Sequence, residues 1–417
     1  MKNSISACRV LLTGATLSGN LGGQALYDSI ADELRRKDST VEFSILSKYP
    51  EDDAAGCQER GYTLIPFSTL DQLIFGGSFF IVGSILKFFH LPTRWLAGKR
   101  LRAFYENDIL VDASGIAFTD DRSFTNVLIN ALWFLPALVS GIPIIKVSQT
   151  LGPYRKWYVR FFGNLVLKHI HVLVCRGQQS YEYTKAFLKK GSIYNLPDVA
   201  FCLQPADKSV ADTLLRTYAL APERYIAVGP SFVMQNFLQP GLYVEIVSSC
   251  INQLADKTDL PFVLVPHSWK HRKRLGVDSV HDDLSVCQEI AQKIDPNVSC
   301  IVIDKELSAR EFKSIIGNAH MAIGSRYHFL IAALSSGVPS MALGWSHKYR
   351  ELFREFDMVH FVLEHQNMSK QNVCMLAEEL LARRDECCTL IRSKLDDVKK
   401  RSAKNAELIL SLLNNHE

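Results

Sequence analysis

The chain has 417 residues, of which 47% are hydrophobic, and it carries 47 Lys and Arg against 43 Asp and Glu. This composition excludes a disordered charged segment and a minimal disulfide-stabilised module. A net charge of +4 is too small for a nucleic-acid-binding footprint. The length allows two or three domains, each large enough to bury its own core.

The cysteine pattern indicates a reduced, metal-free protein. The ten cysteines form no CxxC pair and no cluster with histidines at zinc spacing. Residues 1–9 lack an apolar core of signal-peptide length, which favours a cytoplasmic protein. The glycosylation sequons at Asn297 and Asn367 are therefore expected to be unused.

Short β-branched runs alternate with helix-length amphipathic segments, which is the pattern of α/β proteins with parallel sheets. Strands are predicted at 10–13, 41–46, 109–112, 144–148, 172–175, 225–229, 262–266, 300–303, 321–324 and 340–343. Polar residues and prolines between 195 and 221 favour a domain boundary near residue 215.

We therefore predict two Rossmann-like α/β domains, residues 1–215 and 216–366, whose parallel sheets face a cleft that holds the ligand. Residues 367–417 are predicted to be helical throughout, because apolar residues recur there at spacings of three and four. These C-terminal helices are expected to pack across the fold and close it.

One segment, residues 73–102, combines an apolar run with basic and aromatic residues. Residues 73–86 carry no charge, and the run is too short to span a bilayer as a helix. It fits either a buried helix or lid, or a segment lying in the membrane interface beside anionic lipid. A second apolar stretch, 127–145, is interrupted by prolines and a glycine and predicts a buried helix followed by a core strand.

The first predicted strand runs into a glycine-rich loop, residues 14–24. Its spacing matches neither GxGxxG nor GxxxxGK[ST], so it fits either a phosphate cradle or a tight turn before a helix. Within the loop, Asn20 either caps the following helix or orients a ligand.

The strongest local signal follows the predicted strand that ends at Gly324. Ser325 is expected to cap a helix whose first turn carries Arg326 and His328, and Gly337 is expected to end that helix. Backbone N–H groups and the helix dipole favour an anion at such a position. Side chains there emerge at the carboxyl edge of a parallel sheet, where an Arg and a His can line one crevice.

His267 follows the predicted strand 262–266 and should emerge at the same edge. A histidine can act there as general acid or base, and Asp282 or Asp283, which follow the basic loop 270–274, would fix its tautomer. Arg176 and Lys348 follow other predicted strands, so cations at several strand ends indicate one anionic ligand.

In this order, the motifs resemble those of the polysaccharide pyruvyl transferase family, whose two-domain fold is similar to that of GT-B glycosyltransferases. The matching pieces cover most of the chain: 19–25, 111–115, 148–153, 175–180, 197–201, 266–267 and 324–348. The last piece is the most specific. Two positions differ from the usual pattern, because Gly23 stands where Asp is common and Ala113 begins what is usually a glycine triplet.

The resemblance implies transfer of a pyruvyl group from phosphoenolpyruvate, the donor substrate, to a sugar of a cell-surface or exopolysaccharide precursor as a pyruvate ketal, without cofactor or metal. It assigns catalysis to Arg326, to His328 in donor binding or as acid, and to His267 as acid or base. The predicted substrate-binding residues are Arg176, Ser325, Lys348, Asn20, Gly22, Ser114, Gly115 and Gln149. The C-terminal domain is expected to bind the donor and the N-terminal domain the acceptor.

The predicted partners are phosphoenolpyruvate, a sugar or lipid-linked oligosaccharide acceptor, and the cytoplasmic leaflet of the membrane, but not nucleic acid. Residues 73–102 would then hold a cytoplasmic enzyme peripherally on the inner face of the plasma membrane. Two alternatives stay open. One is a nucleotide-sugar-dependent GT-B glycosyltransferase, and the other is a catalytically dead, membrane-bound assembly partner, against which Arg326, His328 and His267 argue.

Overall fold

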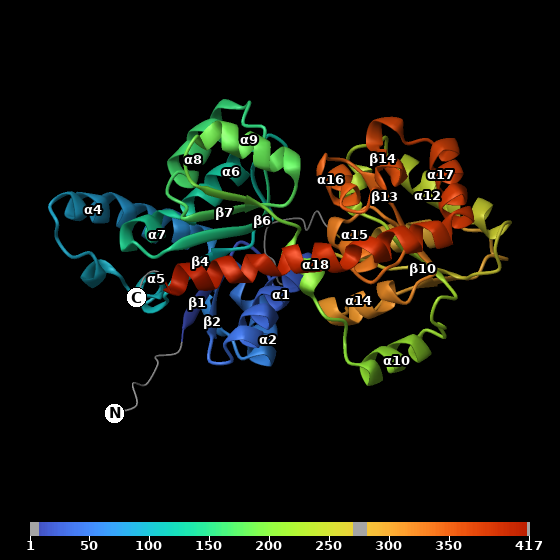
Figure 1. Cartoon of the computed structure of the whole chain (residues 1–417), viewed down its shortest axis with the longest axis horizontal. Coiled ribbons are helices and arrows are strands. Elements are labelled where there is room, and N and C mark those ends of the chain that lie inside the picture. The colour runs from blue at the N-terminus through green and yellow to red at the C-terminus, as the bar shows by residue number, and fades with distance from the viewer. Residues whose placement is uncertain (1–7, 270–281, 415–417) are drawn as a thin grey trace. The chain divides into compact units, whose positions relative to one another are not determined.

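The structure, a computed structural model, describes residues 8–269 and 282–414, so the predicted basic loop at 270–274 lies outside the described residues. The chain forms two compact units, each with its own parallel sheet (Figure 1). Unit 1 comprises Met1–Ser18, Leu26–Val199 and Arg401–Glu417, and unit 2 comprises Gly19–Ala25 and Ala200–Lys400.

Unit 1 contains a parallel sheet in the order β3-β2-β1-β4-β6-β7-β8, with β5 paired to β6. Its strands are β1 Arg9–Thr13, β2 Glu42–Ser47, β3 Thr63–Pro66, β4 Ile109–Asp112, β5 Ile116–Thr119, β6 Ile144–Gly152, β7 Val172–Cys175 and β8 Ser192–Asn195. Its helices are α1 Leu21–Lys37, which begins in unit 2, α2 Pro50–Arg60, α3 Thr69–Asp71, the π-helix η1 Gln72–Gly76, α4 Gly77–Phe88, η2 Arg94–Leu96, α5 Ala103–Glu106, α6 Phe124–Leu132, α7 Leu135–Ser140, α8 Trp157–Leu167 and α9 Gln178–Leu188.

Unit 2 contains a parallel sheet in the order β11-β10-β9-β12-β13-β14. Its strands are β9 Ile226–Gly229, β10 Phe262–Leu264, β11 Cys300–Val302, β12 Met321–Gly324, β13 Ser340–Gly344 and β14 Val362–Glu364. Its helices are α10 Lys208–Thr217, α11 Phe232–Gln235, α12 Leu242–Ala255, α13 Asp283–Ala291, α14 Ala309–Gly317, α15 Tyr327–Leu334, α16 Lys348–Arg354, α17 Lys370–Ala382 and most of α18 Arg384–Asn414, with short 3-10 turns η3 Val199–Cys202, η4 Val359–Phe361 and η5 His365–Asn367.

Both sheets have the doubly wound order, in which the chain adds strands on one side and then returns to the other side of the first strand. Central strands such as β4, β6 and β12 are buried along their whole length, because helices cover both faces. The prediction of two Rossmann-like domains is confirmed. The order reverses between β1 and β4 in unit 1 and between β9 and β12 in unit 2, so each unit has a crevice at those carboxyl ends.

The chain passes from unit 1 to unit 2 after Val199, whereas the sequence pattern placed a boundary near residue 215. Residues 200–217 belong to unit 2 because they pack on α14: α10 contacts α14, and Ala206 N donates to the carbonyl of Arg310. The predicted C-terminal helices are present as α17 and α18, and the last residues of α18, from Arg401, belong to unit 1.

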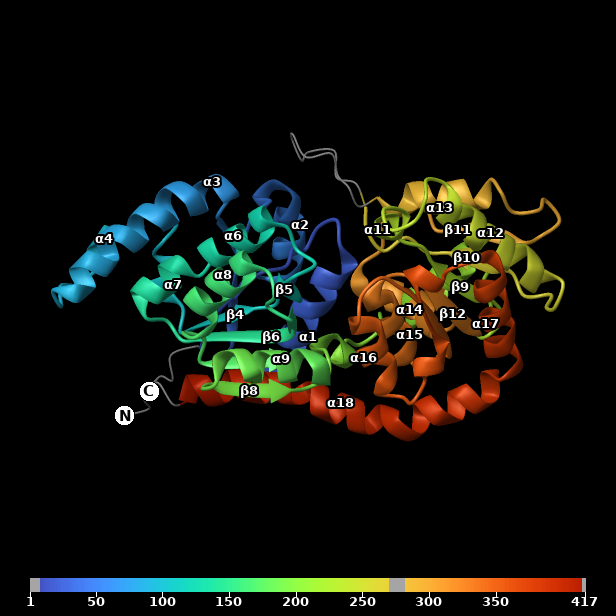
Figure 2. The ribbon, with the colours of Figure 1, turned by 90° about the horizontal axis from the view of Figure 1, so that it is seen from above.

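The apolar segment at 73–102 is not a buried helix. It forms η1, α4 and the following loop, and the apolar helical stretch Thr69–Phe88, long enough to cross a membrane, is only 28% buried. Figure 2 shows α3 and α4 as a helical arm along the edge of unit 1. The stretch 127–145 forms helices followed by the core strand β6, as predicted, but only α7 is largely buried, since α6 buries Val127 and Ala131 alone.

A buried ion pair joins two central strands of unit 1. Lys146 on β6 pairs with Asp112 at the end of β4, and both side chains are almost fully buried. The Lys146 ammonium also lies 4.5 Å from the ring centroid of Phe134. Burial lowers the pKa of Lys146, and the charge of Asp112 opposes that shift. The charges therefore stabilise each other only while both are present.

Lys146→Met is expected to lower the free energy of unfolding by about 3–5 kcal/mol, because it leaves the Asp112 carboxylate buried without a counter-charge. Urea denaturation followed by circular dichroism measures this loss. The exposed Lys190→Met serves as control and should change the value by less than about 0.5 kcal/mol. Equal stability of the two variants would contradict the role of the pair.

Candidate functional site

The three predicted catalytic residues come together at the carboxyl edge of the unit 2 sheet. Arg326 and His328 follow β12, and His267 follows β10. The imidazole rings of His267 and His328 are nearly parallel, with centroids 6.2 Å apart. This is the crevice at the point where the strand order reverses, which is the usual ligand position in such sheets.

Arg326 is held by a buried carboxylate. Its Nε donates to Asp283 Oδ2 at 2.8 Å and its Nη2 to Asp283 Oδ1 at 2.5 Å, which is a bidentate pair. The Arg326 side chain is 15% exposed and that of Asp283 is fully buried. The guanidinium is therefore fixed in position, and its charge is largely balanced by its partner.

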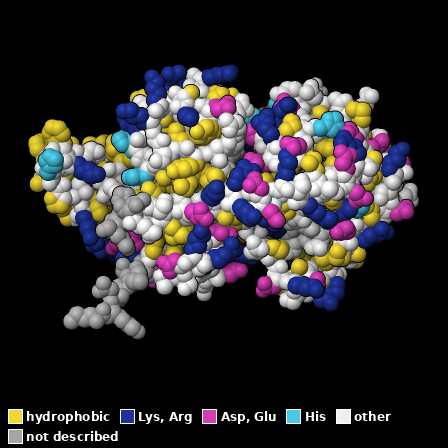
Figure 3. Space-filling view, viewed as in Figure 1, with side chains coloured by type: hydrophobic (Ala, Val, Ile, Leu, Met, Phe, Trp, Pro, Cys, Tyr) yellow, Lys and Arg dark blue, Asp and Glu magenta, His cyan; other side chains and the backbone are white. Residues whose placement is uncertain are grey.

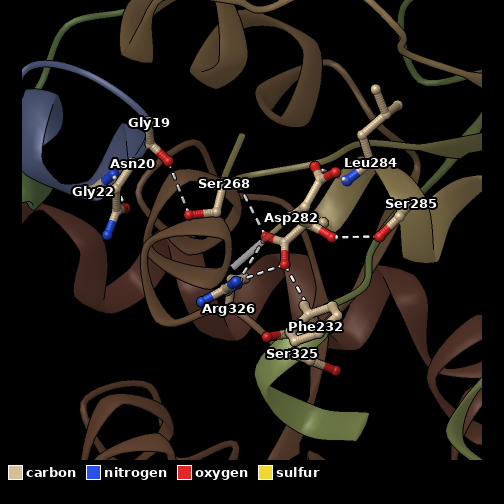
Figure 4. A network of polar contacts seen from close by, with 12 residues as sticks. Gly19, Asn20, Gly22, Phe232, Ser268, Asp282, Leu284, Ser285, Ser325 and Arg326 are labelled. Carbon is tan, nitrogen blue, oxygen red and sulfur yellow. Dashed lines mark hydrogen bonds and ion pairs between the residues drawn. The ribbon is translucent and has the colours of Figure 1, made fainter. Parts of the chain in front are cut away.

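Asp283 also accepts backbone hydrogen bonds from two other loops. Phe232 N donates to Oδ1 at 2.8 Å and Ser268 N donates to Oδ2 at 3.0 Å (Figure 4). The carboxylate thus ties the loops after β9 and β10 to Arg326, after β12. Asp282 or Asp283 was predicted to fix the tautomer of His267, but Asp282 caps α13 and Asp283 binds Arg326.

His267 is buried and has no hydrogen-bond partner on either ring nitrogen among the described residues. Burial, followed by the charges of Arg326 and His328, lowers the pKa of His267 well below 6.5. The imidazole is therefore neutral at pH 7. A buried polar ring without a partner costs free energy, which a substrate hydroxyl or ordered water would recover.

The glycine-rich loop docks beside the two histidines in unit 2. Trp269 N and Ser268 Oγ both donate to the carbonyl of Gly19 at 3.0 Å, and Leu21 N donates to the carbonyl of His267. Asn20 caps α1, because its Oδ1 accepts from Gly22 N at 3.0 Å. Although Asn20 follows β1 in sequence, it thus belongs to the unit that holds the predicted catalytic residues.

Gly22 allows α1 to approach His328. A Cβ placed on Gly22 would lie 2.4 Å from His328 Nδ1, well inside contact distance. The backbone of Gly22 is helical and would accept any residue, so the reason for a glycine here is the short distance to His328. Gly22, predicted as a substrate-binding residue, is therefore a residue that shapes the pocket of His328.

Ser325 does not cap α15, contrary to the sequence-based prediction. The N-cap is Arg326, and the helix begins at Tyr327. The Ser325 hydroxyl instead lies 2.7 Å from the Tyr243 hydroxyl, and its carbonyl accepts from Tyr349 Oη at 2.8 Å. The Ser325 hydroxyl is engaged by the core, and we interpret the residue as one that positions Arg326.

Lys348 begins α16, close to α15, with its ammonium among aromatic rings. Its Nζ lies 4.1 Å from the ring centroid of Trp345, 5.1 Å from Tyr349 and 5.6 Å from Tyr327. Lys348 is only 5% exposed, so its cation is largely removed from water. Cation–π contacts stabilise it there.

A lysine that the sequence analysis did not select also faces the histidines. Lys313, His267 and His328 line a cavity of about 10 Å³, room for about one water molecule, whose other walls are apolar. Lys313 Nζ donates to the carbonyl of Leu203 at 2.6 Å. Burial, then the charges of Lys399 and Arg310, lower the pKa of Lys313 to about 7. In the sequence, Lys313 is one residue of an ordinary amphipathic helix, so the pattern gave no reason to select it as a site residue.

The remaining predicted residues gather at the carboxyl edge of the unit 1 sheet. Ser114 Oγ lies 2.9 Å from Asp112 Oδ2 and 3.1 Å from Gln149 Oε1, so its single proton is donated to one or the other. A Cβ on Gly115 would lie 3.4 Å from Arg176 Nη1. The structure therefore brings Ser114, Gly115, Gln149 and Arg176 together, as a group separate from that of unit 2.

Arg176 is bound within this group. Its Nη1 donates to Asp198 Oδ2 at 2.6 Å and its Nε to Thr150 Oγ1 at 2.9 Å. Both members of the ion pair are buried. Arg176 is thus part of a buried network. The sequence predicted a cation that faces a ligand, but it did not predict the ion pair of Arg176 with Asp198.

The described residues contain no group of three or more His, Cys, Asp and Glu placed to hold a metal ion. What they do offer is a neutral histidine beside a second histidine, a fixed arginine and the N-terminus of α15. Such a set can bind an anion and move protons.

Comparison with known proteins gives one family match. The family model described as polysaccharide pyruvyl transferase matches residues 20–347. A curated relative, the amylovoran biosynthesis protein AmsJ of Erwinia amylovora, is 21% identical over 410 residues, which covers 86% of this chain and 89% of AmsJ.

Solved structures share the fold. UDP-GlcNAc 2-epimerase from Neisseria meningitidis is 12% identical with a TM-score of 0.63, and the alignment covers 98% of this chain and 100% of the epimerase. A ugt transferase from Siraitia grosvenorii is 10% identical with a TM-score of 0.55, covering 97% and 99%. At these identities the likeness concerns the fold alone.

Gly22→Ala is expected to displace the His328 ring and to lower the free energy of unfolding by about 1–3 kcal/mol, because the added Cβ overlaps Nδ1. Histidine NMR signals and urea denaturation measure both effects. Gly77→Ala in α4 is the matched control, since a Cβ there meets no atom within 4 Å. It should be neutral or stabilising by up to about 1 kcal/mol. An unshifted His328 signal in Gly22→Ala would refute the close approach.

His267 should make the protein sensitive to acid. Its pKa is lowered in the folded state, so below pH 6.5 the unfolded chain binds a proton that the folded protein does not. Stability then falls with decreasing pH, by up to about 1.4 kcal/mol per pH unit. His267→Gln is expected to remove this contribution between pH 6.5 and 5, whereas the exposed His90→Gln should leave the wild-type slope. Denaturant titrations at each pH test this, and an unchanged slope in His267→Gln would refute it.

Proposed function

Because the chain belongs to the polysaccharide pyruvyl transferase family, we propose that it transfers a pyruvyl group from phosphoenolpyruvate to a sugar of a polysaccharide precursor, as a cyclic ketal. The relative named for amylovoran biosynthesis supports a polysaccharide as the product. The observation that carries the proposal is the pairing of His267 and His328 beside the fixed Arg326 at the crevice of unit 2.

The proposed reaction needs two proton transfers and one anion site. Protonation of the methylene carbon of phosphoenolpyruvate makes the adjacent carbon electrophilic. One sugar hydroxyl adds to that carbon, the carbon–oxygen bond to phosphate breaks, and a second hydroxyl adds to close the ketal. The two hydroxyl protons replace the one given to carbon and the one taken up by phosphate, so the reaction balances without a redox partner.

The neutral state of His267 favours distinct roles for the two histidines. His267 is neutral because its pKa is lowered, so it is suited to accept the proton of a sugar hydroxyl. His328 is then assigned as the acid that protonates the methylene carbon. Its ring lies against α1 at Gly22, which fixes its direction.

The anionic groups of the donor need positive charge that Asp283 does not cancel. Arg326 uses Nε and Nη2 to bind Asp283. Its remaining N–H groups can donate to one oxygen of the donor's phosphate or carboxylate. The N-terminus of α15 adds backbone N–H groups, and Lys348 lies within the same group of loops. We assign Ser325 and Asn20 to shaping this donor site.

A second candidate function is sugar transfer from a nucleotide sugar. One observation favours it: the buried Glu351 in α16 has its Oε2 3.6 Å from His347 Nε2, and a carboxylate after the fifth strand of such a sheet suits a ribose. The ugt transferase that shares the fold was solved with UDP. The experiment below includes this donor for that reason.

The proposal predicts acceptor-dependent release of phosphate from phosphoenolpyruvate with a panel of lipid-linked and nitrophenyl glycosides. His267→Gln and His328→Gln should each lower kcat by about 10²-fold or more, because each removes a proton transfer. Arg326→Ala should raise KM for phosphoenolpyruvate and lower kcat.

The exposed His360→Gln is the matched control and should keep wild-type turnover. Near-normal turnover in all three site variants would refute the assignment. Absence of release, with a nucleotide sugar as the sole compound that raises the melting temperature, would favour the glycosyltransferase instead.

A further inference from the structure

Unit 1 exposes an unusual number of large apolar side chains on one helical arm. We call this set the α4 surface, and it extends from α3 to η2. Phe88 is 80% exposed and Trp95 is 70% exposed. The exposed apolar members of the α4 surface are Leu70, Leu73, Ile74, Phe75, Ile81, Val82, Ile85, Phe88, Phe89, Leu91 and Trp95. A soluble surface rarely gathers so many on neighbouring turns.

The opposite face of the arm is firmly seated on unit 1. Phe79 and Gly83 are buried, and α4 packs along α7. A Cβ on Gly83 would lie 2.5 Å from Val139 Cγ1, so the glycine lets the two helices approach closely. One side is thus fixed to the protein while the other stays exposed, which is the geometry of a helix that lies on a surface, since a bilayer-spanning helix is surrounded by lipid.

Beyond Asp71, which ends α3, the charged residues of the arm and of the loop that follows it are all basic. Residues 72–105 contain five basic residues and no Asp or Glu. Lys87, Arg94, Lys99, Arg100 and Arg102 are all exposed. Lys87 donates to the carbonyl of Leu138, and Arg100 pairs with Asp71 at the start of the arm. Figure 3 shows hydrophobic side chains gathered over the arm, with Lys and Arg near them.

A groove runs beside the arm. It measures about 520 Å³ and lies between α4 and the loop at 96–101. Phe75, Phe79, Val82, Leu96 and Leu101 provide apolar walls, and Lys99 and Arg100 stand at its edge. An apolar groove with cations at the rim matches a lipid, whose chain is apolar and whose phosphate is negative.

We propose that the α4 surface docks on a bilayer that contains anionic lipid, with the arm in the interface and its exposed apolar side chains inserted. The arm Thr69–Phe88 has 20 residues and is about 30 Å long, so it offers a continuous row of insertion points. The aromatic residues Phe88, Phe89 and Trp95 at its end suit the headgroup level. The five basic residues complement the negative headgroups of anionic lipid. A protein partner would instead need acidic residues placed to match them.

The proposal does not rest on the pyruvyl transfer proposed above, because membrane binding is measured without substrate. The full-length chain should float with vesicles of phosphatidylcholine and 25% phosphatidylglycerol at low salt, and bind several-fold less to phosphatidylcholine alone. Phe88→Ser/Trp95→Ser should weaken binding to the mixed vesicles by about tenfold or more. Arg94→Gln/Lys99→Gln/Arg102→Gln should weaken it by about fivefold per charge, and 1 M salt should do likewise.

Met375→Ser in unit 2 is the matched control, since Met375 is 61% exposed outside the α4 surface, and it should bind as wild type does. Melting curves check that all variants fold. The apolar variant should also keep wild-type turnover on a soluble acceptor, so loss of docking and failure of the chemistry are read separately. Absence of flotation, unchanged binding in Phe88→Ser/Trp95→Ser, retention after carbonate extraction as for a spanning helix, or a dimer that the same variant dissociates would each overturn the proposal.

Discussion

The buried carboxylate of Asp283 is the constraint on which the candidate site of unit 2 depends. It receives two hydrogen bonds from Arg326 and one each from Phe232 N and Ser268 N, so a single side chain fixes the loops after β9, β10 and β12. An ion pair this deep adds little net stability compared with apolar packing, but removing one partner costs several kcal/mol. Its consequence is therefore positional: it holds Arg326 in one orientation and places Ser268 where the Asn20 loop can bind.

That placement connects a motif near the start of the chain to the histidines. Ser268 donates to the carbonyl of Gly19, and the helix that begins after Asn20 lets Gly22 approach His328. Each contact thus limits the next: Asp283 fixes Ser268, Ser268 fixes the loop, and the loop limits the position of the His328 ring. The backbone of His267 is fixed by the bond from Leu21 N, and the His328 ring lies against Gly22, so the same loop contacts both histidines.

The sequence predicted well what depends on local pattern. All ten predicted strands are present, since most of them are central strands buried on both faces that read as apolar runs, and the meeting of His267, Arg326 and His328 followed from their positions after parallel strands. Four strands were missed: the edge strands β3, β8 and β14, which are only partly buried, and the short β5, which pairs with β6 alone. Long-range pairing was harder: Asp283 binds Arg326 across 43 residues, and the loop 19–25 joins unit 2 although it follows β1.

The electrostatics of the site are compatible with the proposed donor, which carries a phosphate and a carboxylate. Burial, followed by the neighbouring Arg326 and His328, keeps the pKa of His267 well below 6.5, and burial lowers the pKa of Lys313 to about 7, so the resting pocket discourages additional positive charge. An anion placed at the N-terminus of α15 reverses this balance, because its charge favours the protonated forms of both groups. Binding of a phosphate and a carboxylate would therefore raise the pKa of His267 toward neutrality, where a proton can be both accepted and given back, and would raise the pKa of Lys313 above about 7, which favours its charged form. In this arrangement the substrate itself prepares the acid–base chemistry, and the Arg326–Asp283 pair, already neutral, takes little part in that shift and serves to orient the anion.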